Sequence, residues 1–259
     1  MRGFEQQTDA MFVYLSPESF VPKEHPLRPI RKMVDEALNK LSPVFSQMYS
    51  HTGRPSIPPE RMLKAMLLQV LYSIPSNTKL VEQIHFSILF RWFLGLGLDE
   101  PVWDHSSFSK NQERLLQTDI AARFLSEVVE QATRKKLLSV EHFSVDGTLI
   151  QAWASIKSFK AKDDDGDPPA GKNPTRDFRG EKLVNETHAS TTDPEAKLYR
   201  KSNTHDARLS YAAHLVTDNR NGLVITSAVT EADGLAERTT ATAMIAKVAP
   251  RKRRITVAA

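Results

Sequence analysis

The sequence predicts an α+β chain in which an all-helical N-terminal region is followed by a mixed β-sheet. Between Pro26 and Leu138 the apolar residues recur at helical spacing. From Glu141 the period changes to the alternation of strands, and a hairpin and a further helix follow. We therefore expect two domains, residues 1–138 and residues 139–259.

Helical periodicity predicts five helices in the N-terminal region. Ser76 is a favourable N-cap for the third helix, and Gly95 suits its C-terminus. The cationic residues 134–136 complement the C-terminus of the fifth helix. The five helices are expected near residues 30–41, 59–71, 76–94, 106–116 and 120–134.

The second domain combines strand patterns, one further helix and a polar insertion. Strands are expected near residues 141–150, 211–217, 223–229 and 255–257, the helix at 236–248, and the insertion, read as a long loop, at about 158–205. This order suits an incomplete mixed sheet of the ribonuclease H type, in which the first and fourth strands lie side by side.

Composition narrows the possible classes of protein. The chain of 259 residues has no cysteine, which excludes disulfides and thiolate metal sites. Its formal charge is only +4, so a polyanion would have to bind at local basic patches. The apolar stretches are too short for a membrane span, and the N-terminus lacks the apolar core of a signal peptide. We expect an intracellular chain with no membrane partner.

Asp146 is the candidate catalytic acid. On a strand, Ser144, Asp146 and Thr148 would share one face while Phe143 and Val145 face the core. The alternative is that Asp146 and its following glycine form a turn, and from the pattern alone the two interpretations are about equally good. Metal-assisted phosphodiester chemistry needs two or three carboxylates around two Mg²⁺ ions, so Asp146 could not hold them alone.

Three segments, taken in order, resemble an insertion-sequence DDE transposase with an InsH-type N-terminal domain. They are Arg91–Leu96, Val102–Asn111 and His142–Phe159. The resemblance covers nearly the whole chain from Phe12 onward, and it is carried by the order of the segments rather than by any one of them.

The resemblance implies a DNA transposase that cuts element ends and joins them to target DNA with Mg²⁺ (or Mn²⁺). The first acid of the family corresponds to Asp146, as both catalytic residue and metal ligand. The second would follow the strand begun by Ile255, and the third would lie on a later helix, both beyond Ala259. We therefore expect an N-terminal part that is inactive alone.

The same resemblance implies binding to terminal inverted repeats and target DNA, a homo-oligomer when complete, and a cytoplasmic, nucleoid-associated location. A function from another class stays open, in which the chain is a catalytically inactive DNA-binding remnant or an inhibitor of the full-length transposase.

DNA phosphates would be met by lysines and arginines. A helix containing Lys110 and Arg114 could read a groove, although its polar residues could equally form the outer face of an ordinary bundle helix. From the residues alone, the run at 251–254 is better interpreted as a solvated loop before a strand, and the resemblance favours a DNA contact. Arg91, Arg200 and Lys201 are further candidates. The main candidates are Lys110, Arg114, Lys157, Lys160, Arg251, Lys252, Arg253 and Arg254.

For the other polar and aromatic residues, a structural role or exposure to solvent is a simpler explanation than catalysis or binding. The acidic run at 163–167 lacks the spacing of a calcium loop. His205 and His214, on either side of the start of a strand, could approach the site of Asp146, although core, surface or hydrogen-bonding roles are the first expectation. Structural roles are expected for Asp218, Glu231, Asp233, Trp92, Phe93, Trp103 and Phe108.

Overall fold

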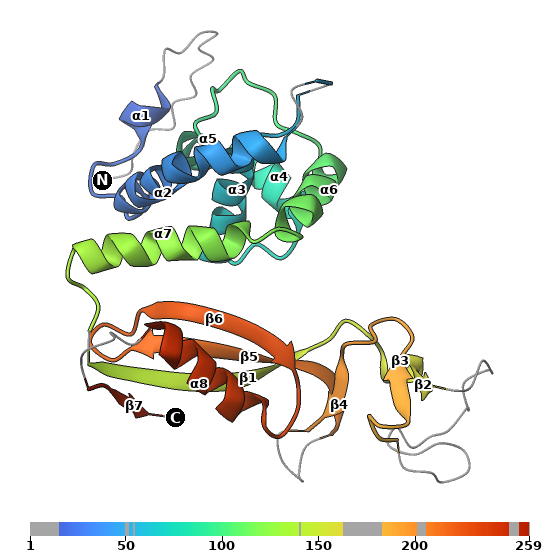
Figure 1. Cartoon of the computed structure of the whole chain (residues 1–259). Helices are drawn as coiled ribbons and strands as arrows, with labels where there is room; N and C mark the ends of the chain where they lie inside the picture. The colour runs from blue at the N-terminus through green and yellow to red at the C-terminus, as the bar shows by residue number, and fades with distance from the viewer. Residues whose placement is uncertain are drawn as a thin grey trace, which may run out of the picture. The chain divides into compact units, whose positions relative to one another are not determined.

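A computed structural model describes residues 16–49, 52–53, 55–139, 141–162, 183–200, 206–248 and 254–258. The chain combines helices with a mixed β-sheet (Figure 1), which confirms the mixed class expected from the sequence. It divides into two compact units, Met1–Val128 and Val129–Ala259, and the division falls within helix α7 (Ile120–Arg134).

Helices build the first unit. Pro59 starts one of them, where its missing N–H costs nothing, and the Asp104 carboxylate caps another by accepting from the N–H groups of Ser106 and Ser107. No described helix is both long and apolar enough to cross a membrane. The helices before α7 are α1 (Pro17–Phe20), α2 (Leu27–Met48), α3 (Pro59–Leu71), α4 (Asn77–Phe86), α5 (Ile88–Leu94) and α6 (His105–Leu116).

The single helix expected from Ser76 to Gly95 is wrong, because the chain forms two helices, α4 and α5, separated at Ser87. The Ser76 hydroxyl does cap α4, accepting from the N–H of Lys79 at 3.2 Å. Ser87 is extended (φ −98°, ψ 115°), and its hydroxyl accepts from the N–H of Phe90, so it caps a second helix. Gly95 ends α5 in the left-handed conformation (φ 71°), as expected.

The core of the first unit gathers the apolar faces of α2 to α7. Phe93 and Phe108 are fully buried, and Trp92 is nearly so. Trp103 stacks on Phe108 with ring centroids 6.0 Å apart. The structural reading of these four aromatic residues is therefore confirmed.

The second unit is built around strand β1 (His142–Gln151). β1 pairs antiparallel with β5 (Arg208–Asp218) and parallel with β7 (Thr256–Ala258). The other edge of β5 pairs with β6 (Val224–Glu231) and with β4 (Lys197–Tyr199). The hairpin of β5 and β6 and the strand β7 lie where the sequence predicts them.

Helix α8 (Ala236–Val248) covers one face of this sheet, contacting β1, β5 and β6 (Figure 1). Phe143 and Val145 of β1 are buried on that face with Val216 and Met244. Because side chains alternate along a strand, the opposite face of β1 carries the intervening residues.

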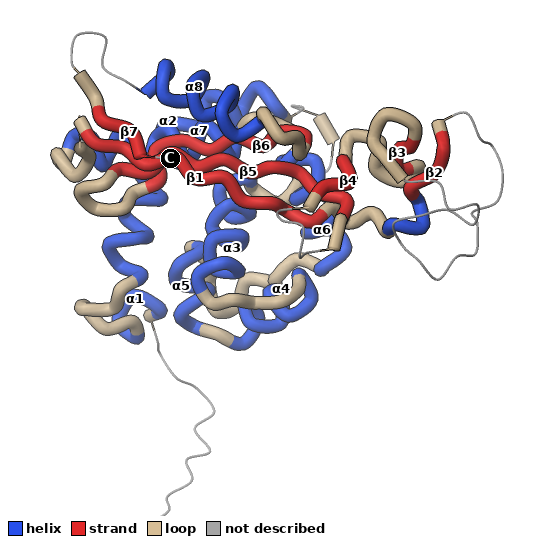
Figure 2. The backbone as a smooth tube through the Cα atoms, turned by 90° about the horizontal axis from the view of Figure 1, so that it is seen from below, coloured by secondary structure: helices blue, strands red, loops and turns tan. Residues whose placement is uncertain are grey.

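The polar segment expected as a long loop contains short strands in its described parts. β2 (Phe159–Ala161) pairs antiparallel with β3 (His188–Ser190) as a separate two-stranded sheet, which lies beyond β4 (Figure 2). Phe159 packs in a small core with Ala152, Ala154 and Leu209. Strands of three residues carry too little alternation to be recognised from sequence.

Replacing Phe93 tests the core of the first unit. Phe93 is 0 % exposed, whereas Phe86 at the end of α4 is 78 % exposed. Phe93→Ala should lower the free energy of unfolding by about 3–5 kcal/mol through a lost buried side chain and a cavity, and Phe86→Ala by less than about 0.5 kcal/mol. Denaturant unfolding of both variants measures the difference, and equal losses would contradict this packing.

Candidate functional site

Asp146 lies in the middle of β1, on the face opposite α8. The backbone continues as a strand through Gly147, so the alternative of a turn at this point is wrong. Asp146 is exposed, while its neighbour Val145 is buried against α8. Alternation along the central strand therefore presents one carboxylate to solvent from a rigid element.

The neighbours of Asp146 on its own strand are polar, and its partner on the adjacent strand β5 is apolar. Ser144 and Thr148 share its face of β1, and Leu215 is its partner on β5. No described residue donates a hydrogen bond to the Asp146 carboxylate or forms an ion pair with it. Its oxygens are thus free to accept a ligand. Among the described residues there is, however, no group of three or more His, Asp or Glu side chains that could hold a metal ion.

Strand β7 lies beside β1 on the edge away from β5. The paired residues are His142 with Thr256 and Ser144 with Ala258, and the two strands run in parallel. Asp146 is therefore two residues further along β1 than the last pair of this ladder. A continuation of β7 would reach its level.

The opposite face holds His214, which is fully buried and pairs in register with Gly147. Its Nε2 lies 3.0 Å from the hydroxyl of Thr230. A Cβ on Gly147 would lie 3.1 Å from the carboxyl of Glu237, so glycine allows the first turn of α8 to approach the strand. His214 belongs to this packing and does not share the face of Asp146. His205 lies outside the described residues.

The remaining acids considered from the sequence have structural roles. The buried Asp218 accepts hydrogen bonds from the backbone N–H groups of Ser139, Arg220 and Asn221. Glu231 forms an ion pair with Lys197 at 3.4 Å.

Asp233 accepts from the N–H groups of Leu235 and Ala236 at the start of α8, which is how a capping carboxylate stabilises a helix N-terminus. The acidic run at 163–167 lies outside the described residues.

The candidate DNA contacts of the first unit lie on α6. Lys110 and Arg114 are exposed and four residues apart, so they share one side of the helix. Asn111 instead bonds Ser56 at 2.8 Å, and Gln112 accepts from Asn77 at 2.7 Å. The outward face of α6 therefore carries Lys110 and Arg114 together with the exposed Glu113, whereas these two amides join the helix to its neighbours.

In the second unit Lys157 is exposed and Lys160 is half-buried on β2. Arg254 is exposed before β7, and Arg251, Lys252 and Arg253 lie outside the described residues.

Arg91 is unsuited to contact DNA, because it is only 5 % exposed. Its guanidinium donates to the carbonyl oxygens of His85 at 3.2 Å, Gly97 at 2.6 Å and Glu100 at 2.9 Å. It joins α5 to the loop that follows it.

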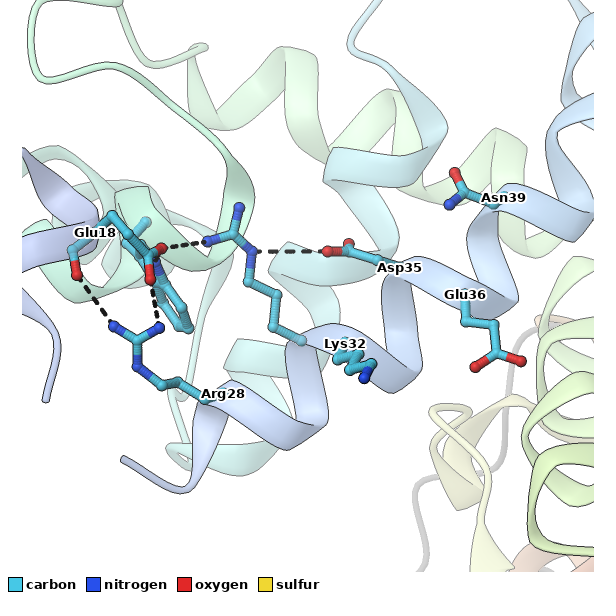
Figure 3. Close-up of a pocket in the computed structure, with 8 residues that line it drawn as sticks. Glu18, Arg28, Lys32, Asp35, Glu36 and Asn39 are labelled. Atoms are coloured by element: carbon cyan, nitrogen blue, oxygen red, sulfur yellow. Dashed lines mark hydrogen bonds and ion pairs between the residues drawn. The ribbon is translucent and has the colours of Figure 1, made fainter. Parts of the chain in front are cut away.

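A pocket of about 530 Å³ opens on the first unit beside α2, shown in Figure 3. Its basic side chains are largely neutralised by acids. Arg28 bonds Glu18, and Arg31 lies within 3.9 Å of Glu18 and 3.7 Å of Asp35. Both guanidiniums also lie over the ring of Trp92, at 5.1 and 4.5 Å from its centroid.

The indole N–H of Trp92 donates to Glu18 at 2.5 Å. The hydrogen bonds from Trp92 and Arg28 hold the pKa of the Glu18 carboxyl below its ordinary value. This stabilised anion already occupies the position that a phosphate would need, so the pocket is a poor phosphate site. It is better explained as the attachment of α1 to the helical core.

Trp153 is a residue that sequence reasoning did not single out. It lies just after β1 and is fully exposed (102 %), although tryptophan is usually at least partly buried. The only hint in the sequence was its position between two small apolar residues, Ala152 and Ala154. The sequence does not show whether the tryptophan or its alanine neighbours face the core.

Tyr211 provides a test of the contact between β5 and the loop that precedes β4. Its hydroxyl donates to the Asp193 carboxylate at 2.5 Å, and this bond, with burial, raises the pKa of Tyr211 to about 12 from 10.0. The folded state favours the neutral phenol, so the stabilisation is complete below pH 10 and is lost as the pH rises through about 12.

Burial also raises the pKa of Tyr49 and Tyr72, so the test follows one component of the ultraviolet titration of tyrosinate: a late-titrating component near pH 12 that disappears in Tyr211→Phe. In Asp193→Asn the same group should titrate at lower pH, because the main cause of the raised pKa is removed. An unchanged titration in Asp193→Asn would contradict the contact.

Residues 15–114, from the approach to α1 into α6, match the model of a family described as Transposase domain (DUF772). A search of curated proteins and a search of solved structures each found no match. The match covers less than half of the chain, and it supports the expectation of a transposase family. The matched residues are the helical region of the chain, up to α6.

Proposed function

We propose that this polypeptide acts as an insertion-sequence transposase of the DDE type, with Asp146 as the first catalytic carboxylate. The observation that carries the proposal is the exposed position of Asp146 at the centre of β1, in a chain whose residues 15–114 match a transposase domain. The strand order β6, β5, β1, β7, with β7 parallel to β1, supports a ribonuclease H-like sheet.

The register of β7 supports the same site. Ala258 lies opposite Ser144, so the position two residues beyond Ala258 on a continued strand would lie opposite Asp146. An acid there would share the face of the Asp146 carboxylate, because paired residues of neighbouring strands point the same way. This is the position at which the family resemblance places the second acid.

Mg²⁺ or Mn²⁺ is the cofactor that such a site would use. The Asp146 carboxylate suits these ions, since it is a hard oxygen donor without a competing partner among the described residues. One carboxylate does not complete a two-metal site, and the described residues supply no others beside it. When bound, the ions neutralise charge on the attacking and leaving oxygens of a phosphodiester.

DNA would be held by cations in both units. Lys110 and Arg114 on α6 and Lys157 after β1 are exposed, and no acid among the described residues pairs with them. Such side chains bind phosphates without regard to base sequence.

Asp146→Asn tests the catalytic assignment. Because one carboxylate does not complete the site, the polypeptide is produced together with any coding sequence that follows residue 259 in its gene. It is incubated with Mg²⁺ or Mn²⁺ and DNA that flanks the coding sequence, and strand breaks are counted. We expect breakage to fall about 100-fold or more, while DNA affinity and thermal stability stay unchanged, because the exposed carboxylate supports no packing. Asp206→Asn, another exposed aspartate, is the matched control and should cleave normally.

Equal cleavage by Asp146→Asn would refute the role of Asp146. DNA binding without cleavage by the unaltered polypeptide would favour instead an inactive DNA-binding protein.

The double variant Lys110→Ala/Arg114→Ala tests the DNA-binding face of α6. Its affinity for duplex DNA should fall, and the slope of log affinity against log salt should decrease by about two, because two phosphate contacts are lost. Lys79→Ala/Arg123→Ala removes two cations that already pair with Glu82 and Asp119. Fluorescence anisotropy across a salt series compares them, and the same slope in both variants would exclude α6 from the interface.

A further inference from the structure

Trp153 is held outward by the chain on both sides of it. Ala152 and Ala154 are buried in the small core formed with Phe159 and Leu209. The N–H of Ala152 donates to the carbonyl of Leu209 at 2.8 Å, which fixes the chain to the start of β5. With both neighbours anchored inward, the indole is directed into solvent.

The segment that follows Trp153 is also fixed. The Ser155 hydroxyl caps the short helix η1 (Ile156–Ser158) by accepting from the N–H of Lys157. The Ser158 hydroxyl lies 2.7 Å from that of Ser190, and the N–H of Thr191 donates to the Ser158 carbonyl at 2.8 Å. The indole therefore projects from a braced surface, and binding would cost little ordering of the backbone.

The charge around Trp153 suits an anionic partner. Between Trp153 and the acidic run at 163–167 the chain carries three lysines, at 157, 160 and 162, and no acid. Lys157 is exposed, whereas Lys162 donates to the carbonyl oxygens of Asn185 and Glu186. The guanidinium of Arg208 is held nearby, donating to the side-chain oxygen of Gln151 at 3.1 Å. An exposed aromatic face among cations is the combination that binds unpaired nucleotides, because the ring stacks on a base while the cations meet the phosphates.

We propose that Trp153 is a stacking platform for an unpaired base of DNA, with Lys157 as the adjacent phosphate contact. This inference rests on the proposed function, and it adds a preference for DNA that is frayed or opened near the site. The distance along β1 from Asp146 to the last residue of the strand is roughly 17 Å, at the usual rise per residue of a strand. Trp153 follows shortly after and therefore lies roughly 20 Å from the acid. One DNA strand could reach both with about six nucleotides.

The test measures binding of two oligonucleotides to the whole polypeptide. One is a blunt duplex, and the other is the same duplex with an unpaired tail of about six nucleotides. Unaltered protein should bind the tailed DNA more tightly, with quenching of tryptophan fluorescence that is lost in Trp153→Ala. Trp153→Ala should lower the affinity for tailed DNA roughly five- to hundredfold and the affinity for blunt DNA by less than about twofold. Trp153→Phe should retain part of the preference for tailed DNA.

Lys157→Ala is the matched comparison. It should lower the affinity for both DNAs by a similar factor and decrease the slope of log affinity against log salt by about one. The reason is that it removes a phosphate contact rather than a stacked ring. Trp153→Ala should leave the salt slope and the melting temperature unchanged, since the side chain is fully exposed.

The outcomes separate this inference from the proposed function. If Trp153→Ala binds each DNA as tightly as the unaltered protein does, the inference alone is overturned. The inference alone is also overturned if Trp153→Ala loses the same affinity for the blunt DNA as for the tailed DNA. Dissociation of an oligomer by Trp153→Ala, with DNA binding unchanged, assigns the indole to a protein contact and also overturns it. Failure of the unaltered protein to bind either DNA refutes the proposed function together with the inference.

Discussion

The register of β1 is the constraint on which the second unit depends. Phe143 and Val145 are buried against α8, and this places Asp146 on the opposite face. Side chains alternate with a period of two, so a slip of one residue would bury the carboxylate and expose Phe143. The hydrophobic contacts that stabilise the sheet therefore also determine where its central acid lies, and the same strand aligns β5 on one edge and β7 on the other.

The lysine and arginine side chains of the protein differ in whether they are free to contact a polyanion. Arg28 and Arg31 are paired with acids and lie over Trp92, and Arg91 is buried among carbonyl groups. These arginines hold the helical unit together. Lys110 and Lys157 stand on exposed surfaces, so their charge remains accessible to a polyanion. A modest net charge is thus compatible with local basic surfaces.

Much of the fold followed from periodicity, and the departures have identifiable causes. Long amphipathic helices such as α2 and α7, and the hairpin of β5 and β6, carry repeated signals that point to one structure. The break at Ser87 was missed because the apolar pattern continues through it, and one serine hydroxyl decides it. The turn at Asp146 was an open alternative because a local dipeptide signal competed with the strand, and pairing with β5 overrode it.

By itself the sequence determined the class of fold and the positions of most elements, and it singled out Asp146 as a candidate acid while leaving a strand and a turn open there. Only the tertiary structure decided which polar side chains are accessible. Arg91 and Trp153 show why: an arginine is buried where three carbonyl oxygens converge, and a tryptophan is exposed because its two alanine neighbours occupy the core. Burial depends on contacts between residues far apart in the chain, and local patterns do not contain them.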